Sequence, residues 1–397
     1  MRALSDRAIA QRLRDLEIDI AVDLMGHRGD ARPGILASRP VPIQVSYLGH
    51  PGTIGADFID YIIADSIVVP PGEEAFYAEK VVRLPDCYQV NDAKRVIAEA
   101  TPTRKQAGLP EKGFVFASFN GGNIAAPVFD AWMGLLTRIE GSVLWLSEVS
   151  DGTKFNLHQH AAARGADPVR LIFAPRIAEA EHLARHRLAD LFLDTFPCST
   201  QTAASDALWA GLPVLTCRGN TFAGRVAASQ LQSIGLTELV TSSLADYTAL
   251  ALWLAQDTDI LAEIRKRLAE NRSTRPLFDT DLTRRHLEEA YAVMWARHQA
   301  GGRPASFDVE ARPAPPPPPA PPPPAPPPAA PENAAVPAGA PVSGTTDAVP
   351  ASPAVPPAAP PAPAGAPVSE PSDDAAAPPA AEAATTTAEP PPPVGQS

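Results

Sequence analysis

Five short apolar runs alternate with five helical segments between residues 114 and 234. The apolar runs cover residues 114–119, 143–147, 170–173, 191–194 and 214–216, and the helical segments cover 126–139, 152–164, 178–187, 202–211 and 222–234. Parallel strands need long crossover connections, which are usually right-handed and helical. The alternation therefore predicts an α/β fold with a parallel, doubly wound sheet. Two long helices, 244–271 and 280–299, are expected to close this unit, and its predicted range is 96–302.

A shorter pattern of the same kind precedes it. Ser5 is suited to cap a helix that runs to about Leu16, and strands are predicted at 18–24 and 43–48. The second strand leads into the turn-rich segment GHPGTIG. One helix and two or three strands make too small a sheet to stand alone, so residues 1–95 are expected to form a partial lobe.

Composition changes beyond residue 302. From residue 301 onward the chain holds 32 of its 47 prolines, interleaved with alanine. Such a segment buries too little apolar surface to offset its chain entropy, and its PPPP runs favour polyproline II. Residues 303–397 are therefore predicted to be a disordered Pro/Ala-rich tail that suits partners with aromatic grooves.

Charge and cysteine usage exclude several classes of function. The net charge of −12 gives no basic footprint for nucleic acid, and no apolar run is long enough to span a membrane. The three cysteines are widely spaced, so neither a disulfide framework nor a zinc site is indicated, and a cytoplasmic location fits best. His158 and His160 are two residues apart and do not share a helical face, so no metal site is predicted.

Polar residues follow the predicted strands at the edge where a parallel sheet binds ligands. Anions favour the orphan N–H groups of helix N-termini there, so a nucleotide diphosphate is the expected occupant. The candidates are Asn120, His182, Thr202, Ser205, Asp206, Thr221 and Arg225. Five of them have a structural alternative: helix capping for Ser205 and Asp206, a satisfied surface histidine for His182, a helix cap or an Asx turn for Asn120, and a surface ion pair for Arg225. The chain contains no Walker A loop, HExxH, GxSxG or GxGxxG after the first strand of either lobe.

Several long blocks occur in the same order as in a known family. They include IDIAVDLMGHRGDARPGILASRPVPIQVSYLGHPGTIGADFIDYIIAD, RLADLFLDTFPCSTQTAASDALWAGLPVLT and GNTFAGRVAASQL. Together they resemble the carboxy-terminal catalytic region of the bacterial-type O-GlcNAc transferase family. The resemblance implies a GT-B glycosyltransferase with a complete second Rossmann-like lobe. It also implies transfer of N-acetylglucosamine from UDP-GlcNAc to Ser or Thr hydroxyls of proteins, with inversion and with neither metal nor cofactor.

The resemblance also implies roles for individual positions. Leu48, Gly49 and Pro51 match the loop that approaches the sugar, Asn120 begins the block that reaches the phosphates, and His182 and Arg185 match the residues that face uracil and ribose. Thr202 matches a diphosphate contact and Asp206 the carboxylate on the ribose. No catalytic residue is assigned.

Three departures from the family pattern remove cations. Asn123 and Gln201 stand where the family has a Lys and a His, and Glu179 stands where some members have a Lys. Each lost donor of this kind typically costs roughly 2 to 4 kcal/mol of transition-state stabilisation. In the family, helical TPR repeats and a strand with a further His precede the matching region, so a truncated or degenerate copy is expected. The alternatives are a pseudoenzyme or binding scaffold, or a GT-B enzyme for another nucleotide sugar.

Overall fold

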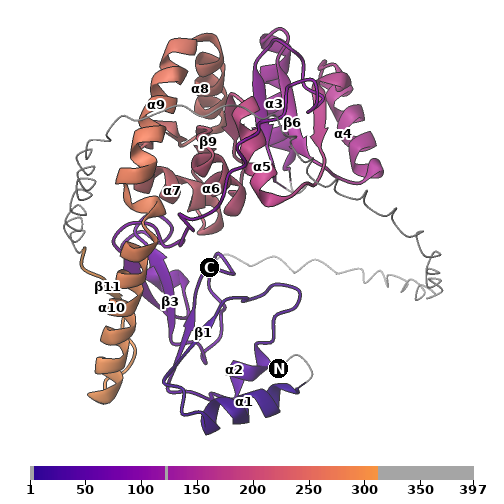
Figure 1. Ribbon diagram of the computed structural model, residues 1–397. Helices are drawn as coiled ribbons and strands as arrows, with labels where there is room; N and C mark the ends of the chain where they lie inside the picture. The colour runs from indigo at the N-terminus through magenta and orange to yellow at the C-terminus, as the bar shows by residue number, and fades with distance from the viewer. Residues whose placement is uncertain (1–3, 121–123, 312–397) are drawn as a thin grey trace, which may run out of the picture. The chain divides into compact units, whose positions relative to one another are not determined.

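The computed structural model describes residues 4–120 and 124–311. The predicted site residue Asn123 and nearly all of the predicted Pro/Ala-rich tail lie outside this part of the chain. The described residues form two parallel sheets with helices packed on them (Figure 1).

The second sheet is the one that the alternation predicts. Its strands follow the order β10-β9-β8-β5-β6-β7, and every neighbouring pair is parallel. The strands are β5 (Val115–Ser118), β6 (Val143–Ser147), β7 (Leu171–Ala174), β8 (Leu191–Leu193), β9 (Val214–Cys217) and β10 (Val240–Thr241). The five predicted strands are confirmed. The sequence analysis missed β10, a two-residue edge strand that is too short to show a periodic pattern.

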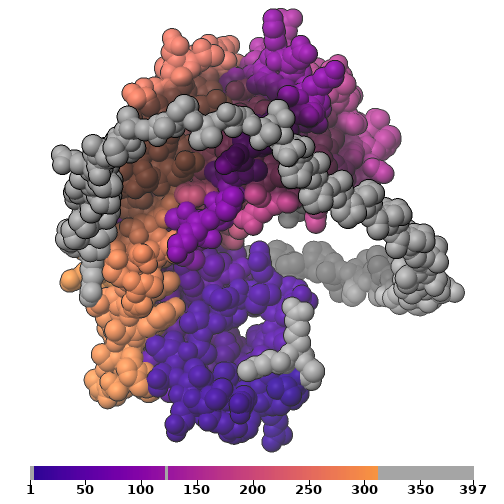
Figure 2. Space-filling view, in the orientation of Figure 1, coloured from indigo at the N-terminus to yellow at the C-terminus, as the bar shows by residue number. Residues whose placement is uncertain are grey.

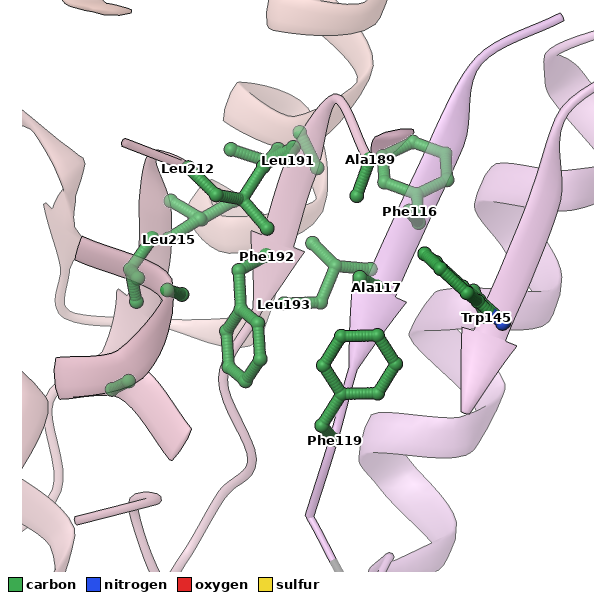
Figure 3. Packing of buried hydrophobic residues seen from close by; sticks show 14 of the residues in the cluster. Phe116, Ala117, Phe119, Trp145, Ala189, Leu191, Phe192, Leu193, Leu212 and Leu215 are labelled. Atoms are coloured by element: carbon green, nitrogen blue, oxygen red, sulfur yellow. The ribbon is translucent and has the colours of Figure 1, made fainter. Parts of the chain in front are cut away.

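The core of this lobe lies where the central strands meet the helices. Phe116, Phe192 and Trp145 come from three strands and are each at most 1% exposed. Phe192 and Trp145 lie on one face of the sheet beside Phe119, whose ring centroid is 6.4 Å and 5.2 Å from theirs, whereas Phe116 lies on the other face (Figure 3). Strands that are covered on both faces read as continuous apolar runs, which is why periodicity detected them.

Helices of the second lobe match the predicted segments except in one place. They are α3 (Ala126–Arg138), α4 (Asp151–Ala163), α5 (Glu179–Arg185), α6 (Thr202–Trp209), α7 (Val226–Ile234), α8 (Leu244–Gln256) and α9 (Thr258–Thr274). The single helix predicted over 244–271 is wrong, because the chain breaks at Asp257. The carboxylate of Asp257 accepts a hydrogen bond from the Ile260 amide at 3.1 Å and so starts a new helix.

The first sheet has the order β1-β2-β3-β4-β11 and is also parallel. Its strands are β1 (Ile20–Asp23), β2 (Ile43–Ser46), β3 (Tyr61–Asp65), β4 (Lys80–Leu84) and β11 (Phe307–Asp308). Helices α1 (Asp6–Asp15) and α2 (Gly34–Ala37) precede β1 and β2. The predicted Ser5 cap is confirmed: its hydroxyl accepts a hydrogen bond from the Ala8 amide.

Distant segments complete this first lobe. Helix α10 (Thr280–Gln299) places Ala290 and Met294 in the core of the first sheet, and Figure 2 shows it in orange against the indigo first lobe. Strand β11 follows α10 and pairs with β4, and Val309 is 6% exposed in the same core. The prediction that disorder begins at residue 303 is therefore wrong for residues 303–311. Their four apolar or aromatic positions were overlooked because a proline-rich sequence follows them.

Candidate functional site

A buried carboxylate organises the turn that follows β8. Asp194 is 1% exposed and accepts four hydrogen bonds: from the hydroxyls of Ser199, Thr200 and Thr216 and from the Thr200 amide, at 2.5 to 2.8 Å. The Tyr247 hydroxyl donates to the Asp194 carbonyl at 3.1 Å. Because a buried carboxylate needs this many donors, the segment from 194 to 200 has little freedom to rearrange.

Asn120, which follows β5, meets the same turn. Its side-chain amide donates to the Thr195 hydroxyl at 2.7 Å, and that hydroxyl donates to the Cys198 carbonyl at 2.7 Å. Strands β5 and β8 are neighbours in the sheet, so the predicted meeting of their carboxyl ends is confirmed. The side chain of Asn120 therefore stabilises the turn rather than capping a helix, and the loop that continues to Asn123 is not described.

Helix α5 carries His182 and Arg185 beside an aromatic layer. The His182 ring lies edge-on to the Phe119 ring, with centroids 5.3 Å apart, and the Arg185 guanidinium lies 5.0 Å from the same ring. Burial, with help from the Arg185 charge, lowers the pKa of His182 to about 4. Burial also lowers the pKa of Arg185 to about 10. At neutral pH His182 is thus an uncharged hydrogen-bonding group, while Arg185 keeps its charge and donates to the Pro175 carbonyl at 2.7 Å.

Helix α6 begins at the end of the ordered turn. Thr202 is its exposed first residue, and Gln201 precedes it without a capping hydrogen bond from its side chain. The Gln201 carbonyl accepts a hydrogen bond from the buried Gln230 amide at 2.8 Å. The first amide groups of α6 therefore lack a side-chain cap, as expected where an anion is to bind.

The segment between the two lobes lies along α6; we call residues 89–95 the linker strap. Ser205 donates a hydrogen bond to Asn91 at 2.6 Å, and Arg95 forms an ion pair with Asp206. Trp209 donates from its indole nitrogen to the Arg95 carbonyl at 3.1 Å. Burial raises the pKa of Asp206, whereas the Arg95 charge opposes that rise. Neither Ser205 nor Asp206 serves as an N-cap, since α6 begins before them. The linker strap was not identified from the sequence, and only the charges of Asp92, Lys94 and Arg95 in a coil segment could have signalled it.

The loop after β2 holds the three remaining predicted positions, Leu48, Gly49 and Pro51. Leu48 has a φ of 66°. A Cβ on Gly49 would lie 1.8 Å from the Leu24 carbonyl oxygen, so only glycine fits between the ends of β1 and β2. The Gly49 and Gly52 amides donate to the carbonyls of Tyr47 and His50 within the loop itself.

The sequence analysis did not single out two histidines at this end of the first sheet, His27 after β1 and His50 after β2. The rings of His27 and His50 meet edge-to-face with centroids 4.9 Å apart, and His27 bonds to the Ile54 carbonyl at 3.0 Å. Burial and the neighbouring His27 lower the pKa of His50.

Helix α7 joins the lobes through polar contacts. Arg225 was a candidate ligand residue, with a surface ion pair as the alternative. It does form an ion pair, although it is only 8% exposed: its two terminal guanidinium nitrogens hold Glu73 of the first lobe at 2.6 and 3.0 Å. Ser229 donates to Asp65 at 2.6 Å, and Gln230 donates to Gln89 at 3.0 Å. This seam fixes the second-lobe turn and the linker strap together.

Cavities elsewhere in the described residues do not include the predicted positions. One of about 470 Å³ lies among Arg218, Gln232 and Asp246, and one of about 880 Å³ lies among Trp209, Arg272 and Phe278. We place the candidate site at the strand ends on the grounds of chemistry and topology. Within residues 4–120 and 124–311, no three His, Cys, Asp or Glu side chains gather as a metal site would require, and no helix is long and apolar enough to cross a membrane.

Comparison with known proteins identifies the relatives. The sequence profile described as glycosyl transferase family 41 matches residues 4–102 and 97–287. Arabidopsis thaliana SEC, named as a probable UDP-N-acetylglucosamine–peptide N-acetylglucosaminyltransferase, is 38% identical over 77% of this chain and 32% of its own length. The rice SPINDLY protein, with the same enzyme name, is 33% identical over 76% of this chain and 33% of its own length. The chain spans about a third of the length of these curated relatives.

Solved structures give the same result for the fold. An O-GlcNAc transferase of Thermobaculum terrenum, solved as a Lys-to-Met mutant, has a TM-score of 0.68 and 30% identity, and the match covers 76% of this chain and 58% of that one. Anabaena HepE, solved with UDP and glucose, has a TM-score of 0.52 at 15% identity, covering 72% and 81%, and supports the fold alone. The chain has the GT-B fold and belongs to glycosyl transferase family 41.

Proposed function

We propose that this chain binds UDP-GlcNAc through its second lobe and transfers N-acetylglucosamine to Ser or Thr hydroxyls of proteins, with inversion and without a metal. Membership of family 41 supports this function together with the names of the relatives. The structural observation that carries it is the ordered turn at Asp194, which meets Asn120 on one side and starts α6 on the other. The cytoplasmic location remains a prediction.

Each candidate group suits a part of the donor. The uncapped N-terminus of α6, with the Thr202 hydroxyl, offers hydrogen bonds to a diphosphate. Asp206, one turn further along α6, suits a ribose hydroxyl, and the neutral His182 suits an uncharged base. Gly49 keeps the first-lobe loop tight enough for backbone to approach a sugar.

Charge near the turn favours a second candidate, a donor-binding protein that does not transfer the sugar. Burial, with a smaller contribution from Glu179, raises the pKa of Asp206, so the two carboxylates lie within electrostatic range of each other. Arg95 is committed to Asp206, and His182 is uncharged at neutral pH. Stabilisation of a leaving diphosphate would therefore rest mainly on backbone amides, which is the arrangement expected of a weak or inactive enzyme.

Two measurements separate these candidates. Isothermal titration of the full chain with UDP tests donor binding, and the Asp206→Asn variant is expected to bind more weakly by about tenfold because a charged acceptor is lost. Transfer of radiolabelled sugar to a peptide panel tests the reaction. Binding without transfer would favour the scaffold, whereas absence of binding at millimolar UDP would end both proposals. Titration with other nucleotide sugars tests whether the donor is UDP-GlcNAc.

A further inference from the structure

The linker strap contacts α6 at successive positions on the helix. Gln89 reaches the carbonyl of Gln201 at 3.5 Å, Asn91 accepts from Ser205, and Arg95 reaches Asp206. The strap thus follows the helix that starts the proposed diphosphate site. A linker can join two lobes without running along a binding helix. These contacts therefore indicate a function beyond joining the lobes.

The ion pair between Arg95 and Asp206 uses only one of the two carboxylate oxygens. Nη1 of Arg95 pairs with Oδ1, while Nη2 lies 3.4 Å from the Ser205 hydroxyl. Oδ2 has no hydrogen-bond partner among residues 4–120 and 124–311. The Arg95 and Asp206 side chains are only 17% and 21% exposed, so the pair is largely withdrawn from water. One oxygen is committed to the strap and the other is left to accept a hydrogen bond.

Further hydrogen bonds hold both the backbone and the side chain of Arg95 in place. The Trp209 indole donates to its carbonyl, and the Arg95 Nε lies 3.4 Å from the Asp92 carbonyl. A guanidinium is a planar fork of fixed geometry, so a guanidinium anchored in this way fixes the rotamer of the carboxylate it holds.

We propose that Arg95 is a positioning residue of the nucleotide site, which holds Oδ1 of Asp206 so that Oδ2 accepts a hydrogen bond from a ribose hydroxyl of a uridine nucleotide. This proposal rests on the proposed function, because it takes Asp206 as the ribose contact. It adds that the linker between the lobes, rather than the second lobe alone, determines how the ribose is recognised.

Arg95 also favours the ionised form of Asp206. The charged groups that act on Asp206 are Arg95, which lowers its pKa, and Glu179, which raises it, against a background of burial that raises it further. A protonated carboxyl group would lose a charged acceptor for the ribose hydroxyl. Removal of Arg95 is therefore expected to raise the pH below which ribose recognition fails.

Paired titrations of the full-length chain test the proposal. The probes are UDP and 2′,3′-dideoxy-UDP, which differ only in the ribose hydroxyls, so the ratio of their dissociation constants reports ribose recognition. We expect the unmodified chain to favour UDP by about tenfold or more, the value of a hydrogen bond to a charged group. Arg95→Met is expected to reduce this preference to about threefold or less, Arg95→Lys to retain part of it, and the acid limit of the preference to move to higher pH in Arg95→Met.

The matched control is Arg187→Met. Arg187 anchors the continuation of the same linker, donating to the Ala98 carbonyl and the Thr101 hydroxyl at 2.9 Å each, without touching Asp206. It is expected to leave the ratio unchanged. In an Asp206→Asn background, Arg95→Met is expected to have no further effect on the ratio.

The possible results separate the two levels of the argument. If UDP binds and the ratio stays the same in Arg95→Met, the positioning role of Arg95 is refuted while the proposed function stands. If UDP binds but the unmodified chain does not distinguish it from the dideoxy compound, the ribose role of Asp206 falls and the proposal falls with it. If UDP does not bind at all, the proposed function fails as well. An Arg95→Met chain that does not fold is replaced by Arg95→Lys and Arg95→Gln, which are read by the same ratio.

Discussion

The two lobes share a parallel sheet but are assembled over different distances along the chain. All six strands of the second sheet come from residues 115–241, and its core adds Cys87, Leu109 and buried positions of residues 247–278 from either side of that stretch. The first sheet needs β11 and α10, which follow the whole second lobe in sequence. The comparison teaches that the lobe with the candidate nucleotide site holds its own geometry, whereas the other lobe depends on distant residues.

The largest effect is expected at the turn of the second lobe. Asp194→Ala removes the acceptor of four hydrogen bonds from buried donors and is expected to lower the free energy of unfolding by about 4 kcal/mol. Urea unfolding followed by circular dichroism measures this. Asp167→Asn is the control, because Asp167 is an exposed cap of a short 3₁₀ helix, and it is expected to cost at most about 1 kcal/mol. Equal losses in the two variants would contradict the role given to Asp194.

The next effect concerns the dependence of the first lobe on β11. Val309→Asp places a charge in the core beside β4 and is expected to cost about 3 kcal/mol. Hydrogen exchange read by mass spectrometry should show loss of protection in β3 and β4 before β5 and β8. The exposed neighbour Glu310, changed to Gln, should leave both lobes unaffected. Simultaneous loss in the two lobes would break the comparison.

An acid effect is expected in the second lobe. Burial, with the neighbouring His182, lowers the pKa of His186 to about 3. Below about pH 6.5, the ordinary pKa of histidine, the unfolded chain binds a proton at this residue that the folded chain does not bind. The free energy of unfolding therefore falls as the pH drops from about 6.5 toward about 3. This one group should cost about 2 kcal/mol between pH 6.5 and 5. Urea unfolding of the unmodified chain and of His186→Gln across this range measures it, and parallel pH slopes in the two proteins would rule His186 out as the source.

The smallest effect on stability is expected at Thr202. Its side chain is exposed at the start of α6, so Thr202→Ala should change the free energy of unfolding by less than about 0.5 kcal/mol. The same change should weaken UDP binding by about threefold or more if the hydroxyl contacts the diphosphate. Calorimetric titration beside a thermal melt measures both, with exposed Thr258→Ala as a control for a threonine at the start of another helix.

The sequence predicted those parts of the fold that depend on local pattern. The five central strands of the second sheet and the Ser5 cap could be read directly, because continuous apolar runs and capping residues carry their own signal. Strands β10 and β11 could not, since two residues give no period, and their pairing is decided by neighbours far away in sequence. The helix break at Asp257 was also missed, because the apolar spacing around this residue gives no sign that one helix ends and another begins.

The candidate site shows the same division. The meeting of Asn120 with the turn after β8 followed from the rule that parallel strands end at one edge. The partners of Asp206 and Arg225 did not follow, because Arg95 and Glu73 belong to coil and turn segments that no periodicity places. The roles of these residues in binding remain predictions.

The late position of β11 affects how the chain is made. Residues 85–306 are synthesised between β4 and β11, which at ordinary translation rates takes roughly 10 to 45 s. During that interval the second lobe has every strand it needs, whereas β4 has an open edge with unpaired backbone groups, a surface on which other extended chains can add. Newborn chains should thus be most prone to association through β4 while still on the ribosome, and a chaperone that shields an extended edge would help this protein before its last strand has been synthesised.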